Sequence, residues 1–183
     1  MILRLCAALA LVLLAACGNA RDQAVVSAVL EDFTSRSDVN IPSSGVTLVV
    51  AETERWSAEK YRFFNFDPSR DTCGVSSQIL ERHLARNVVA ESTASLVQSP
   101  GLWRLASPTD VESLDQGLAT QLPTGQEVRT IASITWPTYS DSGNSAFMLL
   151  HFRWSIHDAV AHYVVESTGR GWKVTCSQFR FYV

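Results

Sequence analysis

The sequence comprises 183 residues, of which 46% are hydrophobic and 18% charged, and its 18 acidic and 15 basic side chains give a formal net charge of −3. This acidic balance argues against nucleic acid as a partner, because tight binding to a phosphate backbone requires a strongly basic face. The length suits a single domain with a core of its own.

The N-terminal residues predict an export signal. Arg4 supplies a positive charge, and an apolar run follows from Leu5 to Ala16. This run is too short to cross a bilayer, which requires about 20 apolar residues in a helix. We therefore expect residues 1–16 to be a cleaved signal peptide.

The end of this run, Leu14-Ala15-Ala16-Cys17, resembles the lipobox of bacterial lipoproteins. The resemblance implies that Cys17 is acylated and holds the mature chain at a membrane, facing the periplasm. Gly18 after the cysteine implies sorting to the outer membrane. The alternative is an ordinary signal peptide with an incidental cysteine, which would leave a soluble periplasmic protein. After cleavage we expect a short polar tether over 17–22 and a single domain over 23–183.

Two cysteines are left for the folded domain, because Cys6 leaves with the signal peptide and Cys17 takes lipid. These two are Cys73 and Cys176, and an oxidising periplasm would pair them in a disulfide. The alternatives are a pair of free buried thiols or one reactive thiol. We expect the disulfide.

The spacing of apolar side chains predicts two helices in the first half of the domain. The first spans 22–35, and the second runs from Gln78 to about Ala94 after an N-cap serine, either Ser76 or Ser77. His83 falls on the apolar face of the second helix. No partner at metal-ligand spacing accompanies it, so we expect a core residue and not a ligand.

Two short strands and a third helix are predicted around this second helix. Val46 to Ala51 is a β-branched run typical of a strand, and Leu102 to Leu105 is a shorter candidate. The third helix runs from Asp110 to Leu122, because Thr109 and Glu112 have the spacing of a capping box.

The C-terminal third predicts a four-stranded antiparallel meander from Val128 to Val183, because three turn signals separate strand-like runs. The turns are expected at Asp141-Ser142-Gly143, His157-Asp158 and Gly169-Arg170. They set the expected cross-strand pairs, which are Trp136–Met148, Ile134–Leu150, Ala132–Phe152, Phe152–Tyr163, Leu150–Val165, Val165–Val174 and Tyr163–Cys176.

All three registers place one set of apolar side chains on a single face of the meander, and this agreement is evidence for the fold. The set is Ala132, Ile134, Trp136, Met148, Leu150, Phe152, Trp154, Tyr163, Val165, Trp172, Val174 and Cys176. The opposite face is polar in the majority. An apolar sheet face must be buried, so we expect an α+β fold with amphipathic helices packed on one face of a curved antiparallel meander of four or more strands.

A helix packed across a curved meander is similar to the cystatin-like and nuclear-transport-factor-like rolls. The stretch Ser133 to Val174, with Pro137, Gly143 and Gly171-Trp172-Lys173-Val174, also resembles uncharacterised bacterial envelope proteins. Neither group has a single function, so these resemblances imply a fold and not an activity.

Enzymes built on such a roll, for example ketosteroid isomerases, direct an aspartate base and an acidic donor into the apolar concavity. The predicted apolar face here offers Tyr163 and Cys176 but no carboxylate, which disfavours a site of that type. We expect Tyr163 to be a core residue whose hydroxyl reaches the rim.

Two other side-chain groups are weaker candidates for a site. His151, Arg153 and His162 are expected to lie close together on the polar face, where they could bind an anion or a metal. Two histidines without a third ligand bind metal weakly, so a solvated sheet face is favoured. Trp56 and Trp103 could stack on carbohydrate, although structural packing is favoured.

The sequence therefore predicts a lipid-anchored protein of the bacterial cell envelope with a non-catalytic binding or accessory role. Its expected partners are the membrane, through the lipid, and another envelope protein. No catalytic residue, cofactor or metal is expected. The alternative is an enzyme or small-molecule binder of the roll class, with its site in the concavity of the sheet.

Overall fold

The computed structural model describes residues 2–37, 41–64, 71–97, 101–115, 121–154 and 157–182, and the side chains among them except those of residues 2–18, 63, 115, 181 and 182. The helices in these ranges are α1 (Ile2–Ser35), α2 (Ala58–Phe63), α3 (Ser77–Arg86) and α4 (Pro108–Asp115). The strands are β1 (Val46–Val49), β2 (Trp103–Leu105), β3 (Val128–Ile134), β4 (Thr138–Tyr139), β5 (Ser145–Trp154), β6 (His157–Thr168) and β7 (Gly171–Tyr182).

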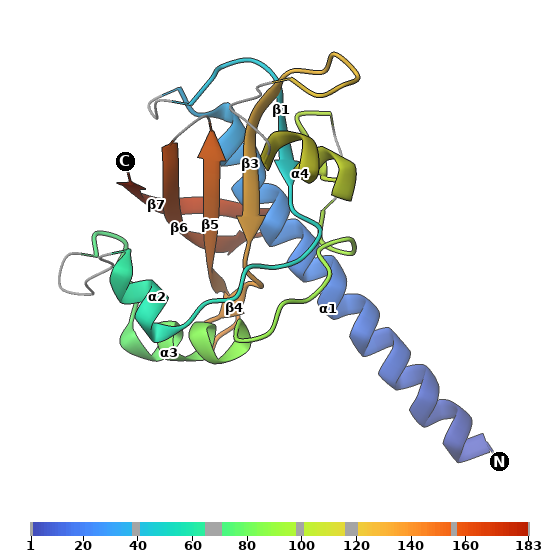
Figure 1. The fold of residues 1–183 in the computed structure, drawn as a ribbon. Helices are drawn as coiled ribbons and strands as arrows, with labels where there is room; N and C mark the ends of the chain where they lie inside the picture. The colour runs from blue at the N-terminus through green and yellow to red at the C-terminus, as the bar shows by residue number, and fades with distance from the viewer. Residues whose placement is uncertain are drawn as a thin grey trace.

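The strands form one open, curved sheet in the order β2-β1-β3-β5-β6-β7, with β4 paired to β5 (Figure 1). β1 runs parallel to β2 and to β3, and the other neighbours are antiparallel. The predicted α+β class and the predicted antiparallel meander, β3-β5-β6-β7, are confirmed. The two strands predicted upstream extend this meander beyond β3.

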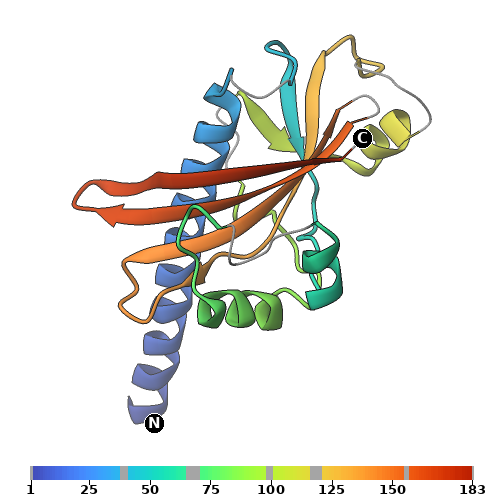
Figure 2. The same cartoon turned by 90° about the vertical axis from the view of Figure 1, so that its left-hand side faces the viewer.

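Helix α1 covers one face of the sheet and projects from the domain at its N-terminal end (Figures 1 and 2). The helix is continuous through residues 17–22, where the sequence predicts a tether. It ends at Ser35, as predicted, and there Arg129 donates hydrogen bonds to the carbonyl oxygens of Thr34 and Arg36. These bonds satisfy carbonyls that the end of a helix leaves unpaired. Five apolar side chains of α1 are fully buried against the strands, namely Val25, Val26, Val29, Leu30 and Phe33.

The opposite face of the sheet is covered as well, so helices lie on both faces, whereas the sequence predicts them on one. On this face, α2 and α3 pack with side chains of β5 and β6 around an aromatic cluster. The buried members of the cluster are Trp56, Tyr61, Phe64, Phe147, Leu149 and Val160. α4 covers a separate cluster over β1 and β3. The face predicted to be mostly polar is therefore largely interior.

Helix α3 begins as predicted and ends earlier than predicted. The backbone N–H of Ile79 donates to the side chain of Ser76, which caps the helix. The last helical residue is Arg86, not Ala94, because the buried Asn87 turns its side chain to the chain between β3 and β4. There it accepts from the Trp136 N–H and donates to the Trp136 carbonyl oxygen.

Helix α4 begins at Pro108, two residues earlier than predicted. Ser107 and Asp110 form the box, because each side chain accepts a hydrogen bond from the other residue's backbone N–H, at 3.1 and 2.8 Å. The box is therefore not formed by Thr109 and Glu112. The described helix ends at Asp115, and Leu122 lies in a turn closed by its own backbone.

The first hairpin of the meander has the predicted register but not the predicted turn. Ala132 pairs with Phe152 and Ile134 with Leu150, as expected. The loop nevertheless contains four residues between Ser140 and Ser145, one more than predicted. An irregular stretch between β3 and β4 absorbs the extra residue, so the expected pair of Trp136 with Met148 is replaced by the β4 pairs.

The second hairpin has a different register from the one predicted. β6 already begins at His157, which pairs with Trp154, and Phe152 pairs with Ala159 instead of Tyr163. Relative to β5, the strand is displaced by an even number of residues, which keeps each side chain on its expected face. Trp154 therefore lies beside His157 and is only half-buried.

The third hairpin contains a β-bulge that reverses the face of one cysteine. Val165 pairs with Val174, as predicted, but β7 then carries one extra residue, Thr175. Cys176 consequently pairs with Val164 and not with Tyr163. An extra residue reverses the alternation of the strand beyond it, so Cys176 faces α2 and α3 and not α1.

Candidate functional site

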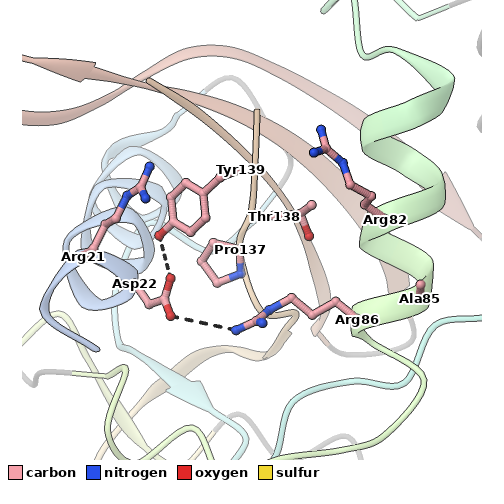
Figure 3. Close-up of a pocket in the computed structure, with 8 residues that line it drawn as sticks. All are labelled: Arg21, Asp22, Arg82, Ala85, Arg86, Pro137, Thr138 and Tyr139. Atoms are coloured by element: carbon pink, nitrogen blue, oxygen red, sulfur yellow. Dashed lines mark hydrogen bonds and ion pairs between the residues drawn. The ribbon is translucent and has the colours of Figure 1, made fainter. Parts of the chain in front are cut away.

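A pocket of about 550 Å³ opens between α1, α3 and β4 (Figure 3). Three arginines contribute to its wall, together with one aspartate and one tyrosine. The lining residues are Arg21, Asp22, Arg82, Ala85, Arg86, Pro137, Thr138 and Tyr139.

The Arg21 side chain is held in place by two aromatic rings and by a backbone carbonyl group. Its guanidinium carbon lies 3.6 Å from the centre of the Tyr139 ring and 5.4 Å from that of Trp172. It also donates a hydrogen bond to the carbonyl oxygen of Gly143 in the loop before β5. A cation stacked on two rings keeps its charge while its position is fixed.

Asp22 links the tyrosine to an arginine of α3. Its Oδ1 accepts a hydrogen bond of 2.5 Å from the Tyr139 hydroxyl, and its Oδ2 lies 3.9 Å from Nη2 of Arg86. Burial raises the pKa of Asp22, although Tyr139 and the two nearby arginines act in the opposite direction. Burial, followed by the bond to Asp22 and its charge, raises the pKa of Tyr139, so this hydroxyl stays protonated.

Arg82 and Arg86 reach the pocket from one face of α3, because residues four apart lie one above the other on a helix. Arg82 forms an ion pair of 2.5 Å with Asp141, and Arg86 stacks over Trp136 at 5.1 Å. Their side chains are 39% and 46% exposed, which leaves both groups accessible from the solvent. Arg82 Nε is buried and has no hydrogen-bond partner among the described residues.

The charges of the pocket do not cancel. Three guanidinium groups meet two carboxylates, those of Asp22 and Asp141, in a chain whose net charge is −3. Guanidinium groups donate paired N–H bonds that match the oxygens of a carboxylate or a phosphate. The arrangement is suited to binding an anion of that kind.

The structure gives His151 and His162 separate partners and does not unite them with Arg153 in one site. His151 lies between two carboxylates, with 2.6 Å from Nδ1 to Glu54 Oε1 and a hydrogen bond from Nε2 to Asp158. Burial lowers the pKa of His151, but the hydrogen bonds and charges of Asp158 and Glu54 outweigh it and raise the pKa to about 9. His151 is therefore a cation that ties β5 to the chain before α2.

This raised pKa predicts a loss of stability in alkaline solution. A cation favoured by folding contributes fully below the unfolded pKa, here 6.5, and its contribution disappears as the pH rises through about 9. We expect the free energy of unfolding to fall by roughly 2 kcal/mol between pH 6 and 10 through this group, less if solvent screens it. Urea unfolding across that range measures the change.

The matched variants are His151→Gln and His157→Gln. The first should flatten the decline of stability with pH, and the second should leave it, because His157 contacts the ring of Trp154 instead of two carboxylates. An unchanged slope in the His151 variant would show that its protonation is not coupled to folding.

His162 is buried, not solvated as favoured from the sequence. Its side chain is 1% exposed, and Nε2 lies 3.1 Å from Asp71 Oδ1. Burial lowers its pKa to about 4, with Asp71 acting against the shift and Arg180 in favour of it. The ring is therefore neutral at physiological pH.

The predicted disulfide between Cys73 and Cys176 is present, with an S–S distance of 2.05 Å. Ligand atoms of Asp71, Cys73 and His162 lie within 4.8 Å of one another, an arrangement that could hold a metal ion. The sulfur of Cys73 is committed to the disulfide, however, and thiolate is the form that binds metal. In this oxidised state Asp71 accepts a hydrogen bond of 3.0 Å from the backbone N–H of Cys73, next to the disulfide.

The remaining candidates from the sequence are structural. Trp56 and Trp103 are 1% and 2% exposed, so neither is available to stack on a carbohydrate. Tyr163 is fully buried beneath α1, as expected for a core residue, but its hydroxyl is buried with it and does not reach the rim. His83 is buried, and its Nδ1 lies 3.0 Å from the Thr138 hydroxyl, which confirms the prediction of a core histidine.

The lipidation site predicted at Cys17 has its backbone in α1, and its side chain lies outside the described residues. In the part of the chain that the structure describes, no helix is both long enough and apolar enough to span a membrane.

The arginine pocket was not predicted from the sequence. Arg82 and Arg86 look like part of a solvated helix face, and their four-residue spacing was the available signal. Their convergence with Arg21 depends on α1 lying against β4, which no local pattern reveals. Comparison of the chain with protein-family models, with curated proteins and with solved structures finds no match.

Proposed function

We propose that this protein is a lipid-anchored component of the bacterial cell envelope that binds an anionic ligand in the pocket between α1, α3 and β4, without catalysing a reaction. The observation that supports binding is that three arginines, Arg21, Arg82 and Arg86, line one pocket. The lipobox-like sequence before Cys17 supports the location, and Gly18 supports the outer membrane.

The partners of the ionisable groups favour binding over catalysis. Asp22 is engaged by Tyr139 and faces Arg86, and Arg82 is paired with Asp141. A carboxylate held in this way orients its partners, and it is not placed to exchange protons with a substrate. The role that this arrangement supports is electrostatic recognition of an incoming carboxylate or phosphate.

Removal of the two α3 guanidinium groups should weaken anion binding. In Arg82→Gln/Arg86→Gln, we expect the affinity for inorganic phosphate to fall by about tenfold or more, because a hydrogen bond to a charged group is worth about 1.5–3 kcal/mol. Calorimetric titration of the detergent-solubilised protein at low salt measures the affinity.

The control for this titration is Arg153→Gln, which removes an exposed arginine at the far end of β5 from the pocket. The control should bind phosphate as the natural chain does. Equal affinity in all three proteins would reject the pocket as the binding site.

The anchor is tested separately through its cysteine. Cys17→Ser should abolish acylation, because the lipid requires the thiol, and the protein should leave the membrane fraction or accumulate as uncleaved precursor. Intact mass and fractionation report this outcome. Finding mature, unacylated natural protein in the soluble periplasm would contradict the proposed anchoring.

A further inference from the structure

The arginine pocket lies at the end of the domain from which α1 projects. α3 and β4, which supply most of its wall, occupy this same end in both views (Figures 1 and 2). Arg21 and Asp22 belong to α1 itself, at the point where the helix meets β4 (Figure 3). The pocket therefore lies where the projecting N-terminal part of α1 leaves the domain.

The distance from Cys17 to the pocket is limited by the chain. Arg21 lies four positions after Cys17, which is about 6 Å along an α-helix. Even a fully extended chain of this length reaches no more than about 14 Å. The headgroup layer on each side of a bilayer is about 5–8 Å thick, so an acylated Cys17 would bring the pocket to the lipid headgroups.

Exposed apolar side chains come shortly after the arginines of α3 in the sequence. Val88 and Val89 follow Asn87, the C-cap of the helix, and they are 60% and 59% exposed. Only one large apolar residue, Leu102, is equally exposed elsewhere in the described chain. Arginines beside exposed apolar side chains are typical of surfaces that lie at a membrane interface.

We propose that this end of the domain is a membrane-docking surface, in which the pocket takes the phosphate of an anionic phospholipid while Val88 and Val89 enter the boundary between headgroups and acyl chains. The proposal rests on the anchoring and anion binding proposed above. The bound anion is then a lipid phosphate, because the pocket lies within reach of the lipid headgroups.

The distribution of charge favours one orientation of the protein at an anionic bilayer. The full sequence has a net charge of −3, and cleavage after Ala16 removes a further positive charge, Arg4, so an anionic bilayer repels the mature protein as a whole. At physiological salt the electrostatic field of the bilayer extends only about 8 Å, so it attracts only those basic side chains that lie close to the lipid surface. The orientation that presents Arg21, Arg82 and Arg86 to the bilayer is therefore favoured over the others.

The test uses the acylated protein reconstituted in two kinds of vesicle, phosphatidylcholine alone and phosphatidylcholine with phosphatidylglycerol. Hydrogen exchange of the segment that contains Val88 and Val89 should slow by about fivefold or more in the anionic vesicles, since one basic residue near such a surface changes occupancy by about that factor. Arg82→Glu/Arg86→Glu should remove the difference. Arg153→Glu, which reverses the charge of a single distant residue and so makes half of that charge change, should preserve it.

A second variant separates docking from folding. Val88→Ser/Val89→Ser changes exposed side chains, so the domain should stay folded while the protection in anionic vesicles decreases. Adding inorganic phosphate to the vesicles distinguishes the sources of the anion. If phosphate abolishes the protection only at concentrations far above its dissociation constant for the pocket of the solubilised protein, lipid is the preferred ligand.

Exchange that is equal in both kinds of vesicle would overturn the docking surface, even where phosphate still binds the solubilised protein. Absence of phosphate binding to the solubilised natural protein would instead reject the anion pocket. A failure of acylation would be seen in the intact mass before any vesicle is made. The three results are therefore distinguishable.

Discussion

Loss of the Cys73–Cys176 disulfide should cost up to about 4–5 kcal/mol of unfolding free energy, because the bridge closes a loop of 103 residues. The chain-entropy argument applies to the unfolded state, whose freedom the bridge restricts. Cys73→Ser/Cys176→Ser should therefore unfold at a much lower urea concentration than the oxidised protein. Equilibrium urea unfolding of both proteins measures the difference.

The reduced natural protein is the matched control for this variant. It should show the same loss of stability as the double serine variant, and its mass should exceed that of the oxidised form by two hydrogens. If reduction left the unfolding midpoint unchanged, the bridge would not contribute to stability.

Replacing Phe152 with alanine should destabilise the domain by about 3–5 kcal/mol, through lost burial and the cavity that remains. The ring is 1% exposed, and its centroid lies 4.7 Å from that of Phe33 on α1 and 5.9 Å from that of Phe179 on β7. A total stability of about 5–15 kcal/mol is typical, so the variant loses a large share. Thermal and urea unfolding measure the loss.

Trp154→Ala is the comparison that tests the register of the second hairpin. Its ring stacks on Phe152 at 5.5 Å and is only half-buried, because β6 begins at His157. We expect a smaller loss for Trp154→Ala than for Phe152→Ala. A larger one would place Trp154 deep in the core, as the register inferred from the sequence requires, and would contradict the observed pairing.

The alternation of apolar residues was sufficient to predict the meander and its buried face, because period and burial act on each strand locally. The turn beyond β5 was not predictable in the same way. His157-Asp158 resembles a two-residue turn, but its residues belong to β6, where Asp158 is bonded to His151. A preference of two residues for a turn is weaker than the tertiary pairing of a strand.

The β-bulge at Thr175 left no signal in the sequence. The cysteines were paired correctly from the compartment implied by the leader, whereas the face of Cys176 was predicted wrongly from strict alternation. The burial of the second face had a partial signal in Leu149 and Val164, two apolar residues among polar ones. Its cover, α2 and α3, could be placed only from contacts distant in the sequence.

The candidate pocket was predictable only in parts. Arg82 and Arg86 could be assigned to one helix face from their spacing, and Tyr139 to the start of a turn. Their common position with Asp22 results from the packing of the first helix on the last third of the chain. Sequence periodicity describes each element but not which elements meet.

The packing of α1 has a consequence for how the chain is made. The helix is completed first, yet Arg36 at its end donates a hydrogen bond of 2.9 Å to Ser177, 141 residues later. At about 5–20 residues per second, a ribosome needs on the order of ten seconds to supply that partner. During this interval Val25 to Phe33 presents its apolar face without the sheet that covers it. We therefore expect nascent chains to need a holding chaperone, and their folding to be slow, because the contacts that bury this helix are among the most distant in the sequence.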